Sequence, residues 1–256
     1  MPTCKLCLED AEKLMESHFI PKATYKRVRD SNSRNPSPLL MSMKGEHQTS
    51  RQAVRELLCE QCEQRFHSRG EDWTLRHAAH DANSFPLREI LQEHTCYAPT
   101  PDLGYFACVE VPSVDVEALA YFALSIIWRA SVTNWTIDGL EINPLDLGRE
   151  YNEAFRRYLL GNTQFPENVA LFFSVSSLDP VLLLATFPQT RNWGDYRSHF
   201  FSIPGMSFTV NVGRRFPDFV RESCLYRGKG RPLFYTPLED LQNMKDFNRL
   251  AEMRRR

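Results

Sequence analysis

The 256-residue sequence lacks several features that would assign it to a specialised class of protein. Its longest apolar run, residues 118–128, is about half of the roughly 20 residues that a membrane-spanning helix needs. Its first residues contain no apolar stretch with a small-residue cleavage site, so we do not expect a secretory signal. A formal net charge of −1 excludes a histone-like or polybasic protein. We therefore expect a soluble, cytoplasmic protein with no membrane partner.

The signatures of several large enzyme classes are also missing. The sequence contains no phosphate-binding glycine loop, no serine nucleophile elbow and no dinucleotide-binding fingerprint. It does contain 42% hydrophobic residues in a chain long enough to bury a substantial core. One or two globular domains are expected, and any active site must be sought in other motifs.

The cysteines supply the strongest local pattern. Their number, seven, is odd and too small for a disulfide scaffold, and four of them form the Cys-x-x-Cys pairs Cys4/Cys7 and Cys59/Cys62. Each pair presents two sulfurs on one side of a tight turn, and four thiolates are a preferred ligand set of structural Zn²⁺. A redox dithiol at the second pair is the alternative, although no thioredoxin-like strand and helix surround it. The other cysteines are expected to be ordinary buried thiols: Cys96, Cys108 and Cys224.

Charge and hydrophobic periodicity divide the chain into two parts. Residues 1–70 hold 12 Lys and Arg against 9 Asp and Glu, a net charge of +3, so the remaining residues carry −4. We expect a zinc domain over residues 1–72 and an α+β domain over 73–256, in which helices precede an antiparallel sheet. The expected elements are helices over Val114–Val132 and Leu147–Leu160, strands over Val169–Val175, Val181–Phe187 and Ser207–Val212, and a terminal helix after Pro237.

The helix over Val114–Val132 is apolar around much of its girth, which predicts a central place in the core. Near its end we expect Trp128 to pack in the interior and Arg129 to extend its guanidinium to the surface. The helix over Leu147–Leu160 is followed by Gly161, a typical C-terminal cap.

Two motifs carry a resemblance to a known superfamily. The first is Glu-Ser-His-Phe-Ile-Pro-Lys over residues 16–22, and the second is Leu-Leu-Cys-Glu-Gln-Cys-Glu over residues 57–63. Together they resemble the HNH-type treble-clef zinc nucleases, and most closely a bacterial subgroup with Ser-His-Ile-Ile-Pro-Lys and Leu-Leu-Cys-x-x-Cys-Glu motifs. The resemblance covers roughly residues 4 to 70 and implies a ββα-metal-like fold.

The resemblance implies a role for several individual residues. His18 matches the general base that takes a proton from the attacking water. Glu63 and His67 match the two helix positions that hold a catalytic divalent ion such as Mg²⁺, and residues four apart share one helix face. A basic stretch with Tyr25 inside it then offers phosphate contacts, or alternatively an exposed charged surface. The residues of that stretch are Lys22, Lys26, Arg27 and Arg29.

Two positions depart from the superfamily pattern. Ser17 stands where the superfamily often has an Asp, Glu or His metal ligand. The asparagine that orients the base has no clear counterpart, and Gln52, Asn35 and His47 are alternatives between which the sequence does not decide.

These features lead to three hypotheses about function. The first is a metal-dependent endonuclease that hydrolyses nucleic acid, with DNA expected rather than RNA. The second is a catalytically degenerate zinc module that binds nucleic acid or a protein. In the third, the zinc module only stabilises the fold, and residues 73–256 recognise a protein partner or substrate. By analogy of architecture, a nuclease of this kind would belong to a defence system.

Overall fold

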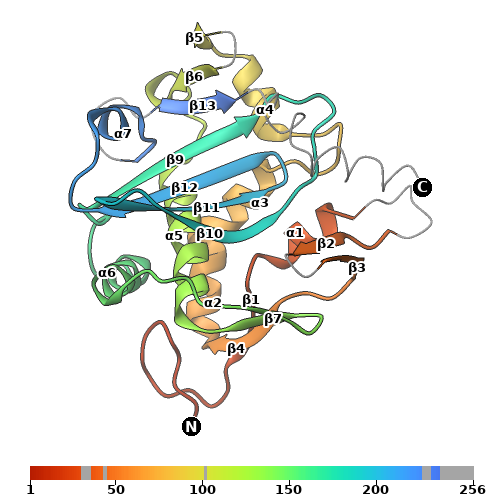
Figure 1. Ribbon diagram of the computed structural model, residues 1–256, viewed down its shortest axis with the longest axis vertical. Coiled ribbons are helices and arrows are strands. Elements are labelled where there is room, and N and C mark those ends of the chain that lie inside the picture. The colour runs from red at the N-terminus through yellow and green to blue at the C-terminus, as the bar shows by residue number, and fades with distance from the viewer. Residues whose placement is uncertain (30–35, 43–44, 101–102, 227–231, 237–256) are drawn as a thin grey trace.

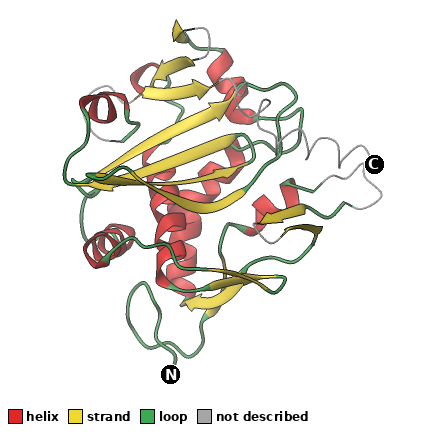
Figure 2. Cartoon of the chain, in the orientation of Figure 1, coloured by secondary structure: helices red, strands yellow, loops and turns green. Residues whose placement is uncertain are grey.

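The computed structural model describes residues 1–29, 36–42, 45–100, 103–226 and 232–236 of this chain. Helices and strands are mixed throughout, so the predicted α+β class is confirmed (Figure 2). The terminal helix predicted after Pro237 lies outside the described residues. The N-terminal elements are β1 (Met15–His18), α1 (Lys22–Arg27), β2 (Leu39–Ser42), β3 (Gly45–Gln48), β4 (Val54–Leu58), α2 (Glu60–Phe66), the π-helical turn η1 (His67–Glu71) and α3 (Asp72–His77).

The rest of the chain surrounds one long helix. Its elements are α4 (Pro86–Gln92), β5 (Tyr97–Thr100), β6 (Leu103–Ala107), the 3₁₀ turn η2 (Cys108–Glu110), α5 (Val116–Val132), β7 (Trp135–Ile137), β8 (Leu140–Ile142), α6 (Arg149–Leu160), β9 (Val169–Ser176), β10 (Thr186–Asn192), β11 (Tyr196–Ile203), β12 (Met206–Gly213), α7 (Asp218–Ser223) and β13 (Pro232–Thr236). No helix within the described residues is long and apolar enough to cross a bilayer.

A seven-stranded sheet forms one layer of the structure (Figure 1). Its strand order is β10-β11-β12-β9-β13-β6-β5, and every pair is antiparallel except β9 with β13. The prediction that helices precede the sheet is wrong in part, because β5 and β6 come before α5 in the chain and still join it. The strand predicted over Val181–Phe187 is also wrong over residues 181–185, which form no strand.

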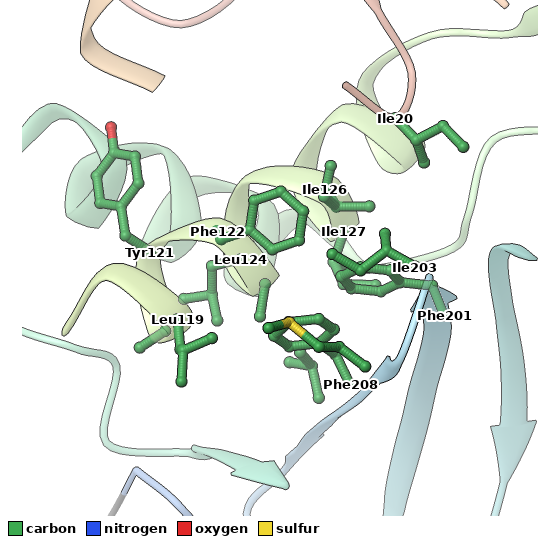
Figure 3. Close-up of a cluster of buried hydrophobic side chains, with 14 of the residues drawn as sticks. Ile20, Leu119, Tyr121, Phe122, Leu124, Ile126, Ile127, Phe201, Ile203 and Phe208 are labelled. Atoms are coloured by element: carbon green, nitrogen blue, oxygen red, sulfur yellow. The ribbon is translucent and has the colours of Figure 1, made fainter. Parts of the chain in front are cut away.

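Helix α5 lies at the centre, as its apolar sequence predicts. It begins after Asp115, whose carboxylate accepts a hydrogen bond of 2.8 Å from the Ala118 N–H and so caps the helix. The Phe122 ring contacts Phe201 and Phe208 on the sheet, with ring centroids 6.0 and 5.4 Å apart (Figure 3). The sheet therefore buries its inner face against this helix.

Helix α5 also packs against the N-terminal elements. The Phe66 ring of α2 meets Trp128 of α5 edge-to-face, with centroids 6.1 Å apart. At Gly70 in η1, an added Cβ would lie 2.8 Å from the Phe122 backbone nitrogen, so only glycine allows this approach. Buried side chains from before and after residue 72 belong to one hydrophobic cluster.

His199 of β11 is a buried titratable group whose protonation should weaken the fold. Burial lowers the pKa of its imidazole to about 4, and Nδ1 lies 2.9 Å from the Thr190 hydroxyl. The unfolded chain binds the proton more strongly, so this stabilisation is present above pH 6.5 and is lost as pH falls towards 4. By pH 4 the free energy of unfolding should have fallen by about 3 kcal/mol because of His199.

Urea unfolding at about pH 7.5 and about pH 4 measures this contribution. On going from about pH 7.5 to about pH 4, the free energy of unfolding of the wild type should fall by about 3 kcal/mol more than that of the His199→Gln variant. The exposed His80→Gln variant serves as a matched control and should keep the wild-type dependence. Identical pH dependence in His199→Gln and the wild type would contradict the expectation.

Candidate metal centre and active site

The four paired cysteines converge on one point. Cys4 and Cys7 lie in the N-terminal loop, and Cys59 and Cys62 lie at the start of α2, yet their sulfurs are all within 4.8 Å of one another. Zn–S bonds of about 2.3 Å in a tetrahedron place the sulfurs about 3.8 Å apart. The Cys7 and Cys59 sulfurs are 3.9 Å apart, so the residues fit a four-thiolate metal site.

The electrostatics of the cluster favour a thiolate at Cys4, whereas the pKa of Cys7 is raised, mainly by burial. The pKa of Cys4 is lowered to about 4, chiefly by a hydrogen bond with Cys62 and further by backbone N–H groups. The same pairing raises the pKa of Cys62. Metal binding requires deprotonated sulfur, and the N–H groups around Cys4 already stabilise that form.

Two hydrogen bonds fix the first cysteine loop to other elements. The Lys5 N–H donates to the Leu57 carbonyl of β4 at 3.1 Å, and Arg156 Nη1 of α6 donates to the Leu6 carbonyl at 2.9 Å. The loop is therefore attached to the second cysteine segment and to the body of the protein.

The other cysteines differ from one another: Cys96 is exposed, contrary to the sequence expectation, Cys108 is half-buried and Cys224 is buried.

Strands β1 and β4 and helix α2 bring the superfamily-like residues together. The strands pair antiparallel, with Ser17 opposite Arg55 and His18 opposite Val54. The buried Ser17 hydroxyl donates a hydrogen bond to the Glu63 carboxylate of α2. Two of the positions that the resemblance assigns to metal binding thus contact each other across 46 residues of sequence.

His18 lies beside this pair at the end of β1 and is half-buried. Its pKa is lowered from 6.5, mainly by burial and also by the charge of Lys22, whereas Gln52 and the Glu63 carboxylate act in the opposite direction. A lowered pKa leaves the imidazole neutral near pH 7, the protonation state in which it accepts a proton. The charges of the Glu63 carboxylate and the Lys22 ammonium therefore both act on the imidazole, in opposite directions.

The structure distinguishes between the three residues that could replace the asparagine with which the superfamily orients its base. Gln52 lies close enough to raise the His18 pKa, and its buried Oε1 accepts no hydrogen bond from the described residues. His47 instead faces Asp138 at 3.1 Å on the surface of β3. Asn35 lies outside the described residues. Gln52 is therefore the candidate that is next to the base.

The basic stretch comprises helix α1 and the residues just after it, and α1 begins four residues after His18. Lys22, Lys26 and Arg29 are exposed, whereas Arg27 is half-buried, which lowers its pKa. The buried Nη1 of Arg27 has no hydrogen-bond partner in the described part of the chain. The stretch therefore presents positive charge beside His18, and its role in binding phosphate remains a prediction.

His67, four residues after Glu63, is exposed at the junction of α2 and η1. Within the described ranges, the four cysteines are the one group of three or more His, Cys, Asp or Glu side chains whose ligand atoms come close together. Glu63 and His67 therefore offer at most a two-ligand site, and their joint binding of a catalytic ion stays a prediction.

Arg129 and Glu71 are two residues near His18 that the sequence interpretation missed. The Arg129 side chain is only 2% exposed, so the expectation that its guanidinium reaches the surface is wrong. It pairs with Glu71 and donates a hydrogen bond of 3.1 Å to the His18 carbonyl. The sequence did contain one indication of this contact, a single arginine near the end of an apolar helix. A guanidinium buried at such a position requires charged or polar partners.

Comparison with known proteins adds no family assignment. No protein-family model matches the sequence, and no curated protein or solved structure matches it either.

Proposed function

We propose that the protein is a metal-dependent phosphodiesterase that cleaves nucleic acid, built on a zinc-bound treble clef of HNH type at its N-terminus. The observation that carries the proposal is the hydrogen bond between Glu63 of α2 and Ser17, the neighbour of His18 on β1, together with the effect of the Glu63 charge on the His18 pKa. An imidazole can act as a general base, and a carboxylate that holds a metal ion and a lysine can stabilise phosphate charge during phosphodiester hydrolysis.

The roles follow from the chemistry of each group. Neutral His18 accepts a proton from a water molecule whose oxygen then attacks phosphorus, while the bond to the leaving oxygen breaks. In this proposal Lys22 neutralises phosphate charge beside the base and Gln52 orients the imidazole, roles that their effects on the His18 pKa support. When bound at Glu63 and His67, a divalent ion such as Mg²⁺ supplies Lewis-acid stabilisation of the leaving oxygen.

The second candidate is a zinc module without catalytic activity that binds nucleic acid or a protein. The Ser17–Glu63 hydrogen bond favours it, because a carboxylate engaged by a serine hydroxyl must exchange that bond for the ion. This candidate predicts salt-dependent binding without cleavage in any divalent metal.

A cleavage assay with matched variants decides between the two candidates. The zinc-loaded protein should nick supercoiled DNA with Mg²⁺ or Mn²⁺, and His18→Ala should lower the rate by about 100-fold or more while zinc stays bound. The exposed His80→Ala variant controls for the loss of a histidine and should keep wild-type activity.

Two results would contradict the nuclease. One is cleavage that His18→Ala leaves unchanged, which would assign it to another group or to a contaminant. The other is the absence of cleavage of DNA and RNA across Mg²⁺, Mn²⁺, Ni²⁺ and Zn²⁺. Retained DNA binding in the second case would support the non-catalytic module.

A further inference from the structure

Arg129 is a deeply buried cation beside the candidate base. It lies in the last turn of α5, far from the N-terminal motifs in sequence, and its side chain is 2% exposed. Burying a guanidinium is costly unless charged and polar partners surround it. Its partners therefore indicate why an arginine occupies this position.

Three N-terminal elements supply these partners. Nη1 donates to the His18 carbonyl of β1 at 3.1 Å, and Nη2 pairs with the Glu71 carboxylate of η1. The guanidinium carbon lies 4.8 Å from the centre of the Phe66 ring of α2, a cation–π contact. One side chain from the body of the protein thus holds β1 relative to α2 and η1.

The residue after His18, Phe19, is also held by the region that follows residue 72. The Phe19 ring stacks on Trp135 with centroids 4.8 Å apart, and Trp135 Nε1 donates to the Arg129 carbonyl at 3.0 Å. The peptide unit between His18 and Phe19 is therefore fixed at its carbonyl oxygen by Arg129 and at the next side chain by Trp135.

A fixed peptide at this point determines the direction of the imidazole. The His18 carbonyl belongs to the last residue of β1, shortly before the chain turns into Pro21 and α1, and the N–H of the same peptide, on Phe19, donates to the Ala53 carbonyl at 2.9 Å. The Cα of His18 is part of that planar peptide unit, so a movement of the carbonyl moves the imidazole relative to Glu63. An error of about 1 Å in a catalytic group can lower a rate by about 100-fold.

We propose that Arg129, held by Glu71, is a positioning residue that fixes the backbone of His18 and thereby aims the base at the scissile phosphate. The inference deepens the proposed nuclease function and rests on it. In this arrangement the region after residue 72 contributes directly to the active site, through α5.

The test uses the full chain with zinc bound and two independent readouts. The first is the ¹H–¹⁵N spectrum of the His18 imidazole, assigned by its absence in His18→Ala. The second is kcat and KM for cleavage of a DNA duplex with Mn²⁺. Arg129→Met should shift the His18 resonances and lower kcat by about 10-fold to 100-fold with little change in KM. Arg129→Lys should be intermediate, because an ammonium cannot form the same fork of donors.

Arg65→Met is the matched control. Arg65 Nη1 donates to the Leu160 carbonyl at 2.9 Å, so the variant also removes a guanidinium–carbonyl bond between the two parts of the chain. It should leave the His18 resonances and kcat at wild-type values. If Arg129→Met does not fold, Glu71→Gln keeps the side-chain shape, weakens the ion pair and should shift the same resonances to a smaller extent.

The proposal is overturned if folded Arg129→Met keeps wild-type His18 resonances and kcat, or if Arg65→Met changes both equally. Failure of the nuclease function gives a different result, namely no cleavage by the wild type. In that case the resonances of Arg129→Met still show whether Arg129 positions His18.

Discussion

Cys4→Ser should lower the stability of the whole chain and weaken metal binding at the cysteine cluster. The Cys4 side chain is fully buried and lies among the three other paired cysteines. Structural zinc contributes on the order of 10 kcal/mol to small zinc modules, a value comparable to the whole stability of many domains. A strong chelator should produce the same loss in the wild type.

Metal analysis and thermal unfolding measure this effect. The wild type should hold roughly one zinc per chain, and Cys4→Ser should hold much less and unfold at a far lower temperature. Cys96→Ser is the matched control, because Cys96 is an exposed free cysteine away from the cluster. A zinc-free wild type with unchanged stability would contradict a structural role for the site.

Removal of residues 1–72 should leave a chain that does not fold. Trp128, Trp135 and Tyr121 are almost fully buried, and each of them contacts an aromatic ring from the N-terminal part. A buried side chain of this size contributes about 1.5 to 3 kcal/mol, so the deletion removes on the order of 10 kcal/mol. It also removes Glu71 and Phe66, which contact the Arg129 guanidinium in the intact chain.

Near-UV circular dichroism and urea unfolding of residues 73–256 test this expectation. The fragment should lack a cooperative transition, and addition of residues 1–72 with zinc in trans should restore part of it. A cooperative transition of the isolated fragment at wild-type stability would contradict it and would support two independent domains.

The long helices could be predicted from sequence because their apolar residues follow the helical period. The prediction of Val114–Val132 agrees closely with α5, and Gly161 ends α6 in the left-handed conformation with φ 81°. Strand β11 escaped prediction because it places Arg197 and His199 on the same side as Phe201, so polar residues interrupt the apolar alternation. The apolar run 181–185 lies outside any strand, since hydrophobicity alone does not specify backbone pairing.

The cysteine cluster and the surroundings of His18 differ in how far the sequence determines them. Two cysteines separated by two residues define a knuckle locally, so the sequence alone predicted the metal ligands that the structure brings together. The surroundings of His18 depend on residues distant in the chain: Arg129 is 111 positions away, and Glu71 reaches the site only through that arginine. No local spacing encodes such contacts, because they exist only once α5 packs against β1 and α2. The tertiary structure alone therefore decided which residues hold His18.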